Sequence, residues 1–152
     1  MLTVIIPTRE SERPLVQTLA PLVAGATAGL IAEVIVADAG SKDATADVAD
    51  LAGCRYVATD GATGARLAGA AKEARAPWLL FLRPGTVPEP GWIETVESFI
   101  GSDRETAQAG IFRPPAPRPR SRCTPRRRRR VRCPVFERPR QRPRARTPAG
   151  LP

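Results

Sequence analysis

The stretch EVIVADAGSKDAT, residues 33–45, shows how this chain is built. Its first six residues are mostly apolar and partly β-branched, which is typical of a strand buried on both faces of a sheet. Polar residues follow, and either Ser41 or Asp43 can cap a helix that runs through Ala52. The buried side of that helix is expected to carry Ala44, Val48 and Leu51. The stretch therefore predicts a strand followed directly by a helix.

The same order repeats over the first hundred residues. Apolar runs typical of buried strands also stand at residues 2–7 (LTVIIP), 54–58 (CRYVA) and 78–82 (WLLFL). The segments between and after them predict helices at about 13–26, 64–75 and 89–100. The first of these helices has Ser11 as a candidate cap and an apolar face of Leu15, Leu19, Leu22 and Val23; the last is expected to stop before Gly101. Alternating strands and helices predict an α/β fold with a parallel sheet sandwiched by helices.

Charge divides the chain into two regions. Residues 1–110 hold nine Lys or Arg and fourteen Asp or Glu, a net charge of −5, whereas residues 111–152 hold fifteen Arg and one Glu, a net charge of +14. We interpret residues 1–110 as the folded domain. The tail, residues 111–152, also contains ten Pro and cannot bury enough apolar surface to offset its ordering entropy, so it is expected to be disordered.

The composition of the tail suggests that it is an out-of-frame translation. All of its basic residues are Arg and none is Lys, although selection for phosphate binding would accept either charge. Arg and Pro are also what GC-rich codons produce in any frame. The alternative is non-specific nucleic-acid binding through runs such as Arg126–Arg130, but after Phe112 the tail has one aromatic, Phe136, for base stacking. No specific nucleic-acid partner is expected.

Several classes of protein are excluded by what the sequence lacks. Cys54, Cys123 and Cys133 have neither the count nor the spacing of a disulfide framework or a zinc site, so Cys54 is expected in the core. The chain has no His, no phosphate-binding loop of the P-loop type, and no glycine fingerprint after its first strand. It shows no signal-peptide pattern and no transmembrane stretch, so we expect a cytoplasmic protein, with peripheral membrane association left open.

Chemistry is expected where the strands end, because ligands of open parallel sheets bind outside the carboxyl ends of the strands. The segments at those ends are Pro7-Thr8-Arg9-Glu10, Asp38-Ala39-Gly40-Ser41 and Arg83-Pro84-Gly85-Thr86, with Gly61–Arg66 opening the third helix. They place a carboxylate and a guanidinium at one edge of the sheet.

These blocks together resemble the family 2 glycosyltransferases, which have the GT-A nucleotide-sugar-binding fold. The matching blocks are TVIIPTRE, EVIVADAGSKDAT, GARLAGAAKEARAPWLLFL and VPEPGW, in the expected order and spacing. The resemblance ends near residue 112, so it covers the N-terminal, nucleotide-binding half of the usual domain.

The resemblance implies roles for individual residues. Pro7, Thr8 and Glu10 would line the nucleoside pocket, Asp38 would accept a hydrogen bond from uracil or hold the ribose, and Arg66 would lie beside the base or the diphosphate. The alternatives remain open: Asp38 as a turn residue that caps Gly40 or Ser41, Arg66 as a solvated charge, and Asp43 as a helix cap.

The family's metal motif is missing. Its fourth strand normally ends in Asp-x-Asp, which holds Mn²⁺ or Mg²⁺ against the diphosphate, but here the positions read Arg83-Pro84-Gly85. No metal or other cofactor is therefore expected. Arg83 would either take over the electrostatic role of the metal at the diphosphate, or mark an inactive site, or simply begin a Pro-Gly turn.

The resemblance implies transfer of a sugar from a nucleotide-sugar, most simply a UDP-sugar, to an unknown acceptor. No catalytic base is identified, because Glu89, Glu94 and Glu97 belong to a helix after the fourth strand and are expected to be solvated. The alternatives are a catalytically inactive nucleotide-binding module and a non-specific nucleic-acid binder that uses the tail.

Overall fold

The computed structural model describes residues 1–101, 109–112 and 135–137. Strands and helices alternate through the first hundred residues, as the sequence predicts. In chain order the elements are β1 (Leu2–Thr8), α1 (Glu12–Thr27), β2 (Ile31–Asp38), α2 (Thr45–Leu51), β3 (Arg55–Ala58), α3 (Thr63–Glu73), β4 (Trp78–Phe81), α4 (Trp92–Gly101), β5 (Ala109–Ile111) and β6 (Val135–Glu137). None of the helices in the described part of the chain is long and apolar enough to cross a membrane.

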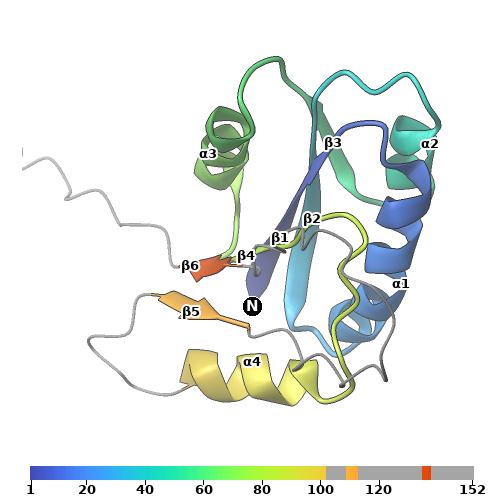
Figure 1. The fold of residues 1–152 in the computed structure, drawn as a ribbon. Helices are drawn as coiled ribbons and strands as arrows, with labels where there is room; N and C mark the ends of the chain where they lie inside the picture. Colours follow the sequence, from blue (N-terminus) through green and yellow to red (C-terminus); the bar gives the residue numbers. More distant parts are fainter. Residues whose placement is uncertain (102–108, 113–134, 138–152) are drawn as a thin grey trace, which may run out of the picture.

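The described strands form one sheet in the order β3-β2-β1-β4-β6-β5 (Figure 1). Strands β1 to β4 run parallel, with Leu2 of β1 opposite Ile31 on one side and Trp78 on the other. Strand β6 is antiparallel to β4, and β5 is antiparallel to β6. The predicted α/β fold is confirmed, and its parallel part ends with two short antiparallel strands.

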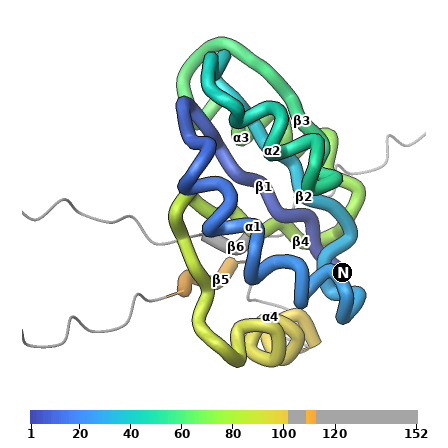
Figure 2. The backbone as a smooth tube through the Cα atoms, turned by 90° about the vertical axis from the view of Figure 1, so that its right-hand side faces the viewer, coloured from blue at the N-terminus to red at the C-terminus, as the bar shows by residue number. Residues whose placement is uncertain are grey.

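Alternation along β1 separates two apolar layers. Leu2, Val4 and Ile6 are fully buried against the apolar face of α1, whereas Ile5 belongs to a second cluster with Ala70 of α3. Because successive side chains of a strand point to opposite faces, this pattern requires a helix on each side of the sheet. Figures 1 and 2 show this arrangement, with α1 and α2 on one face and α3 on the other.

Four local predictions are wrong. Val23 on α1 and Leu51 at the end of α2 are 64% and 88% exposed, and Thr45 and Ala49 form the buried side of α2 instead. Helix α4 begins three residues later than expected, at Trp92, because Pro90 and Gly91 (φ +87°) precede it. Gly101 is the last residue of α4 and does not follow the helix.

Three residues of the predicted disordered tail, Val135–Glu137, form strand β6, so the prediction of disorder is wrong there. Ile111 of the tail is the last residue of β5, and Phe112 follows it. The other tail residues, with Cys123 and Cys133, lie outside the described residues. Their disorder and the out-of-frame origin of the tail stay predictions. Cys54 is half-buried against the larger apolar cluster, as expected, and burial raises the pKa of its thiol.

Helices α1 and α4 pack tightly against each other at Gly25. A Cβ added there would lie 2.6 Å from the Trp92 ring and 3.1 Å from Ile31, so α1 can dock on this side only without a side chain at residue 25. We expect Gly25→Ala to lower the free energy of unfolding by about 1–2 kcal/mol, since overpacking outweighs the gain in helix propensity.

Gly69 of α3 provides the matched control, because a Cβ there meets nothing within 4 Å. Gly69→Ala should leave stability unchanged or raise it by up to about 1 kcal/mol. Urea unfolding of the three proteins checks this. Equal effects of the two substitutions would contradict the packing explanation.

Candidate nucleotide-binding site

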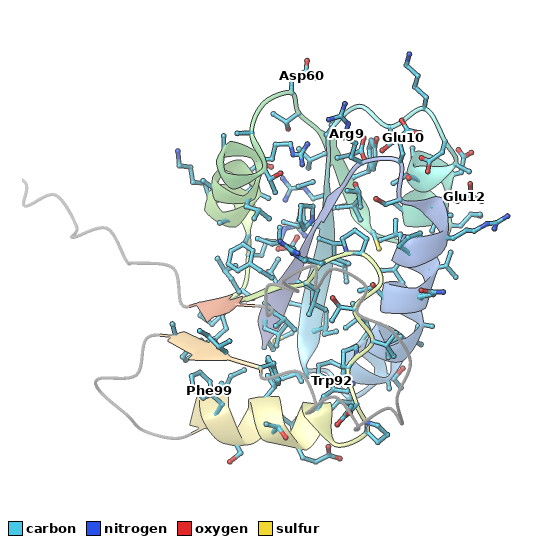
Figure 3. All side chains as sticks on the ribbon, viewed as in Figure 1. Arg9, Glu10, Glu12, Asp60, Trp92 and Phe99 are labelled. Carbon is cyan, nitrogen blue, oxygen red and sulfur yellow. The ribbon has the colours of Figure 1, made fainter. Side chains whose placement is uncertain are left out.

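The polar segments at the strand ends meet at one end of the molecule. In Figure 3, Arg9, Glu10 and Asp60 lie at this end, whereas Trp92 and Phe99 lie at the other, on α4. Strands β1 and β2 end side by side, with Thr8 opposite Asp38. The sheet therefore places the predicted site residues of these two strands together.

The carboxylate of Asp38 is the centre of this region. Its Oδ1 accepts hydrogen bonds from the hydroxyls of Thr8 (2.7 Å) and Ser41 (2.6 Å). Its Oδ2 accepts from the backbone N–H of Ser41 (2.6 Å) and from the hydroxyl of Tyr56 (2.9 Å). The side chain thus links β1, β2 and β3, and Asp38 is 0% exposed. The bond to the Ser41 N–H is the turn cap weighed as an alternative role for Asp38.

Burial and hydrogen bonding act on Asp38 in opposite directions. Burial alone would raise its pKa, but the bonds from Ser41, Thr8 and Tyr56 outweigh burial and hold the pKa at about 2. Burial and the bond to Asp38 in turn raise the pKa of Tyr56 to about 12. At neutral pH the pair is therefore a carboxylate and a neutral phenol that donates to it.

The loops that follow β1 and β2 are joined by hydrogen bonds. Glu10, which has φ +47°, donates its N–H to the Ser41 hydroxyl (2.8 Å), and its carboxylate accepts the N–H of Lys42 (2.8 Å). The N–H of Ala39 also donates to the carbonyl of Thr8 (3.0 Å). A left-handed backbone is unfavourable for a non-glycine residue, so these bonds must hold Glu10 in place.

Asp43 caps two helices at once. Its Oδ1 accepts the N–H of Thr45 at the start of α2 (3.1 Å), and its Oδ2 accepts the N–H of Glu12 at the start of α1 (3.0 Å). The hydroxyl of Thr45 lowers the pKa of Asp43 most strongly. Ser11 occupies the cap position of α1, but its hydroxyl bonds to Arg9 and not to the helix, so its predicted capping role is wrong.

Arg66 lies in the first turns of α3, on the other face of the sheet. It is only 6% exposed, so the alternative of a solvated charge on the helix surface is wrong. Its Nη2 donates to the hydroxyl of Thr63 over 3.4 Å, and its buried Nε has no partner among the described residues. The helix itself starts after Ala62 without a side-chain cap.

At the end of β4, Arg83 begins a tight turn. Its carbonyl accepts the N–H of Thr86 (3.0 Å), with Pro84 and Gly85 (φ +85°) at the central positions, as in a type II turn. The N–H of Gly85 lies within hydrogen-bond distance of the Pro14 carbonyl (2.9 Å) and of the Thr18 hydroxyl (2.8 Å), which fixes the turn to α1. The Arg83 residue is exposed.

The residues of this turn do not fit a divalent cation. Positions 83 and 85 offer a guanidinium and no side chain where the family's motif would offer two carboxylates. Within the described residues, no group of three or more Asp, Glu, His or Cys side chains is placed to hold a metal ion.

An apolar cavity of about 270 Å³ lies between α4 and β5, far from these loops. It is lined by Thr95, Val96, Phe99, Gly110, Ile111 and Phe112. None of these lining residues carries a charge that could pair with a phosphate.

The structure brings Thr8, Glu10 and Asp38 into one bonded network with Pro7 beside Ala37, but shows no bond from Arg66 or Arg83 to this network. Sequence reasoning missed Tyr56 and the double role of Ser41. Tyr56 stands opposite Val36, two residues before Asp38 on β2, and only the register of β3 reveals this relation.

Comparison with known proteins identifies the family. The sequence matches the model of glycosyl transferase family 2 over residues 3–147, and the chain therefore belongs to this family. The match includes β6 and extends beyond residue 112, so the prediction that the resemblance ends there is wrong. No significant match is found among curated proteins.

Solved structures share the fold at low identity. Mannosyl-3-phosphoglycerate synthase from Rubrobacter xylanophilus (TM-score 0.62, 20% identity) covers 72% of this chain and is itself covered to 39%. Glucosyl-3-phosphoglycerate synthase from Mycobacterium tuberculosis was solved with Mn²⁺, UDP and glucosyl-3-phosphoglycerate. It gives a TM-score of 0.60 at 21% identity, covers 72% of this chain and is itself covered to 42%. S. aureus TarS 1–349 gives a TM-score of 0.57 at 23% identity. It covers 65% of this chain, and 32% of its own length is covered. The chain thus has a GT-A-like fold and spans less than half the length of each of these structures.

The low pKa of Asp38 predicts how stability depends on pH. Because the pKa falls from 3.8 to about 2 on folding, the carboxylate contributes about 2 kcal/mol to folding above pH 3.8. This contribution is lost as the pH falls through 2. We expect Asp38→Asn to be less stable than the wild type by at least this amount at neutral pH, and the difference to shrink in acid.

Urea unfolding of both proteins at several pH values between neutral and pH 2 measures the difference. Asp50→Asn, at an exposed position of α2, is the control and should follow the wild type throughout. A gap between Asp38→Asn and the wild type that stays constant with pH would contradict the assignment.

Proposed function

We propose that this chain is the donor-binding half of a glycosyltransferase and binds a nucleotide-sugar, most simply a UDP-sugar. Transfer would pass the sugar to an acceptor that the sequence does not define. Membership of family 2 and the UDP bound in the M. tuberculosis relative support this proposal. The observation that carries it is the buried guanidinium of Arg66, whose Nε has no hydrogen-bond partner among the described residues.

A buried charge without a partner is costly, so its presence needs a reason. The guanidinium of Arg66 has one long bond to Thr63 and an Nε with no described partner, at 6% exposure. The first N–H groups of an α-helix are also unsatisfied, and α3 has no side-chain cap. Helix N-termini favour anions, and guanidinium groups pair well with phosphate oxygens. A diphosphate would satisfy both groups at once.

The other predicted residues would act around this anion site. The loop of Pro7, Thr8 and Glu10 would line the nucleoside, with the hydroxyl of Thr8 already committed to Asp38. Asp38 would read the base or hold the ribose. Arg83, exposed at the end of β4, would reach the diphosphate from the opposite side of the site.

A second function, nucleotide binding without sugar transfer, is favoured by one observation. Positions 83 and 85 lack the metal-binding carboxylates. Glu89, Glu94 and Glu97 are exposed residues and provide no evident catalytic base. Release of sugar from a UDP-sugar by the full chain supports transfer, whereas binding without turnover supports the second function.

The role of Arg66 is tested by calorimetry with UDP on the full chain. We expect Arg66→Met to weaken UDP binding about tenfold to a hundredfold, because a charged hydrogen-bonding group is lost. The same substitution should leave the free energy of unfolding unchanged or raise it, since an unpaired buried charge is removed.

Lys72→Met is the control, because Lys72 is an exposed cation in the last turn of the same helix. It should bind UDP like the wild type. Equal UDP affinity of the Arg66 and Lys72 variants would remove Arg66 from the site.

Binding should not depend on a divalent metal. With a guanidinium and a glycine at positions 83 and 85, a hard cation finds too few oxygen ligands, so Mn²⁺ should leave UDP affinity unchanged. A tenfold rise, about 1.4 kcal/mol, would show that the metal site is misplaced. Arg83→Ala should weaken UDP but not uridine if the guanidinium contacts phosphate; equal effects on both ligands would exclude that contact.

A further inference from the structure

The acceptor capacity of the Asp38 carboxylate is full. A carboxylate has about four lone-pair sites, and in this chain the four donors are the hydroxyls of Thr8, Ser41 and Tyr56 and the N–H of Ser41. Asp38 is also 0% exposed. A ligand can therefore form a hydrogen bond to this carboxylate only by displacing one of the four donors.

The four donors differ in how easily they can leave. Thr8 lies in β1, between β2 and β4, and is 1% exposed. Ser41 supplies two of the four bonds, and its hydroxyl also accepts the N–H of Glu10. Tyr56 is half-buried on β3, the four-residue strand at the edge of the described sheet. Its bond, at 2.9 Å, is the longest of the four and is the one hydrogen bond of its hydroxyl within the described residues.

We propose that Tyr56 determines base specificity, because its hydroxyl occupies the acceptor position of Asp38 that a nucleobase must take. Given the nucleotide site proposed above, a base with a ring N–H at the position that faces Asp38 can replace this neutral donor in place, whereas an exocyclic amine such as N4 of cytosine could donate only from a shifted position. Uracil has such an N–H at its N3, whereas N3 of cytosine is an acceptor and would face the carboxylate with a lone pair. A buried polar group that is left unpaired discriminates strongly between such analogues. Guanine, which also has a ring N–H, would share this advantage over adenine.

The test compares UDP with CDP on the full chain, wild type and Tyr56→Phe. Both ligands carry the same diphosphate, so any non-specific attraction to the Arg-rich tail cancels in the comparison. In the variant, one lone-pair site of the Asp38 carboxylate has lost its donor, so UDP need not displace a hydroxyl there. We expect UDP to bind about threefold to tenfold more tightly, while CDP affinity stays the same. Weaker or unchanged UDP binding, or an equal gain for both nucleotides, overturns the proposal.

Val57→Ala is the control for changes in β3 that do not involve Asp38, because Val57 packs on the α3 side of the sheet. It should alter neither nucleotide's affinity. A gain in UDP affinity for Val57→Ala equal to that for Tyr56→Phe would trace the effect to a loosened strand and overturn the role of the hydroxyl.

A second measurement needs no variant. Tyr56 is the one tyrosine of the chain, so its isotope-labelled ζ-carbon gives a single NMR resonance that reports the state of its hydroxyl. Saturation with UDP should shift this resonance and addition of CDP should not. No shift with UDP, or the same shift with both nucleotides, overturns the displacement even if the variant fails to fold.

Inorganic pyrophosphate separates the two proposals. If pyrophosphate and UDP bind the wild type and both lose affinity in Arg66→Met, the nucleotide site stands, and the UDP and CDP comparison decides the role of Tyr56 alone. If neither UDP nor pyrophosphate binds the wild type or Tyr56→Phe, both proposals fail.

Discussion

The strand ends of this protein depend on one buried negative charge. Asp38 receives hydrogen bonds from β1, from β3 and from the loop after β2. The Ser41 hydroxyl, one of these donors, also accepts the N–H of Glu10. A carboxylate that is removed from water must recover its lost hydration from such donors. The position of the two loops therefore follows from the need to satisfy Asp38, and the left-handed Glu10 is held as part of that solution.

The charged side chains at this end of the molecule differ in how many hydrogen-bond partners they have. Asp38 is satisfied entirely by hydroxyl and N–H groups, and Asp43 receives N–H bonds from the first residues of two helices. Neither carboxylate is available to neutralise Arg66, whose Nε is without a partner in the described structure. A protein optimised only for stability would gain by replacing such a residue, which is why a buried, unpaired cation indicates function more strongly than an exposed one.

The sequence predicted the architecture because apolar runs and helical segments alternate regularly along it. Runs such as VIIP and VIVAD predict buried strands when helices alternate with them, and the bond from Asp43 to the start of α2 is local. Register was not predictable: the bond between Tyr56 and Asp38 exists because β3 pairs with β2 so that Val36 faces Tyr56, and nothing in either strand alone specifies this. The burial of Arg66 was equally hidden, because one turn of an alanine-rich helix has the same sequence pattern on either face. Leu51 and Val23 are exposed because a helix turns toward the sheet the face that packs best against it. In α2 that face carries Thr45 and Ala49.

The place of β1 in the sheet has a consequence for how the chain folds. Leu2 pairs with Ile31 on one edge and with Trp78 on the other, so the first strand has one partner within about thirty residues and the second only after nearly eighty. Contacts of such long sequence separation form slowly, because a large loop must close before they stabilise the chain. During synthesis, β1 and β2 can pair while the far edge of β1 remains open, with its apolar residues unprotected. An open strand edge is a template for intermolecular pairing. The emergence of β4 from the ribosome is therefore the step at which the nascent protein ceases to be prone to aggregation through this strand.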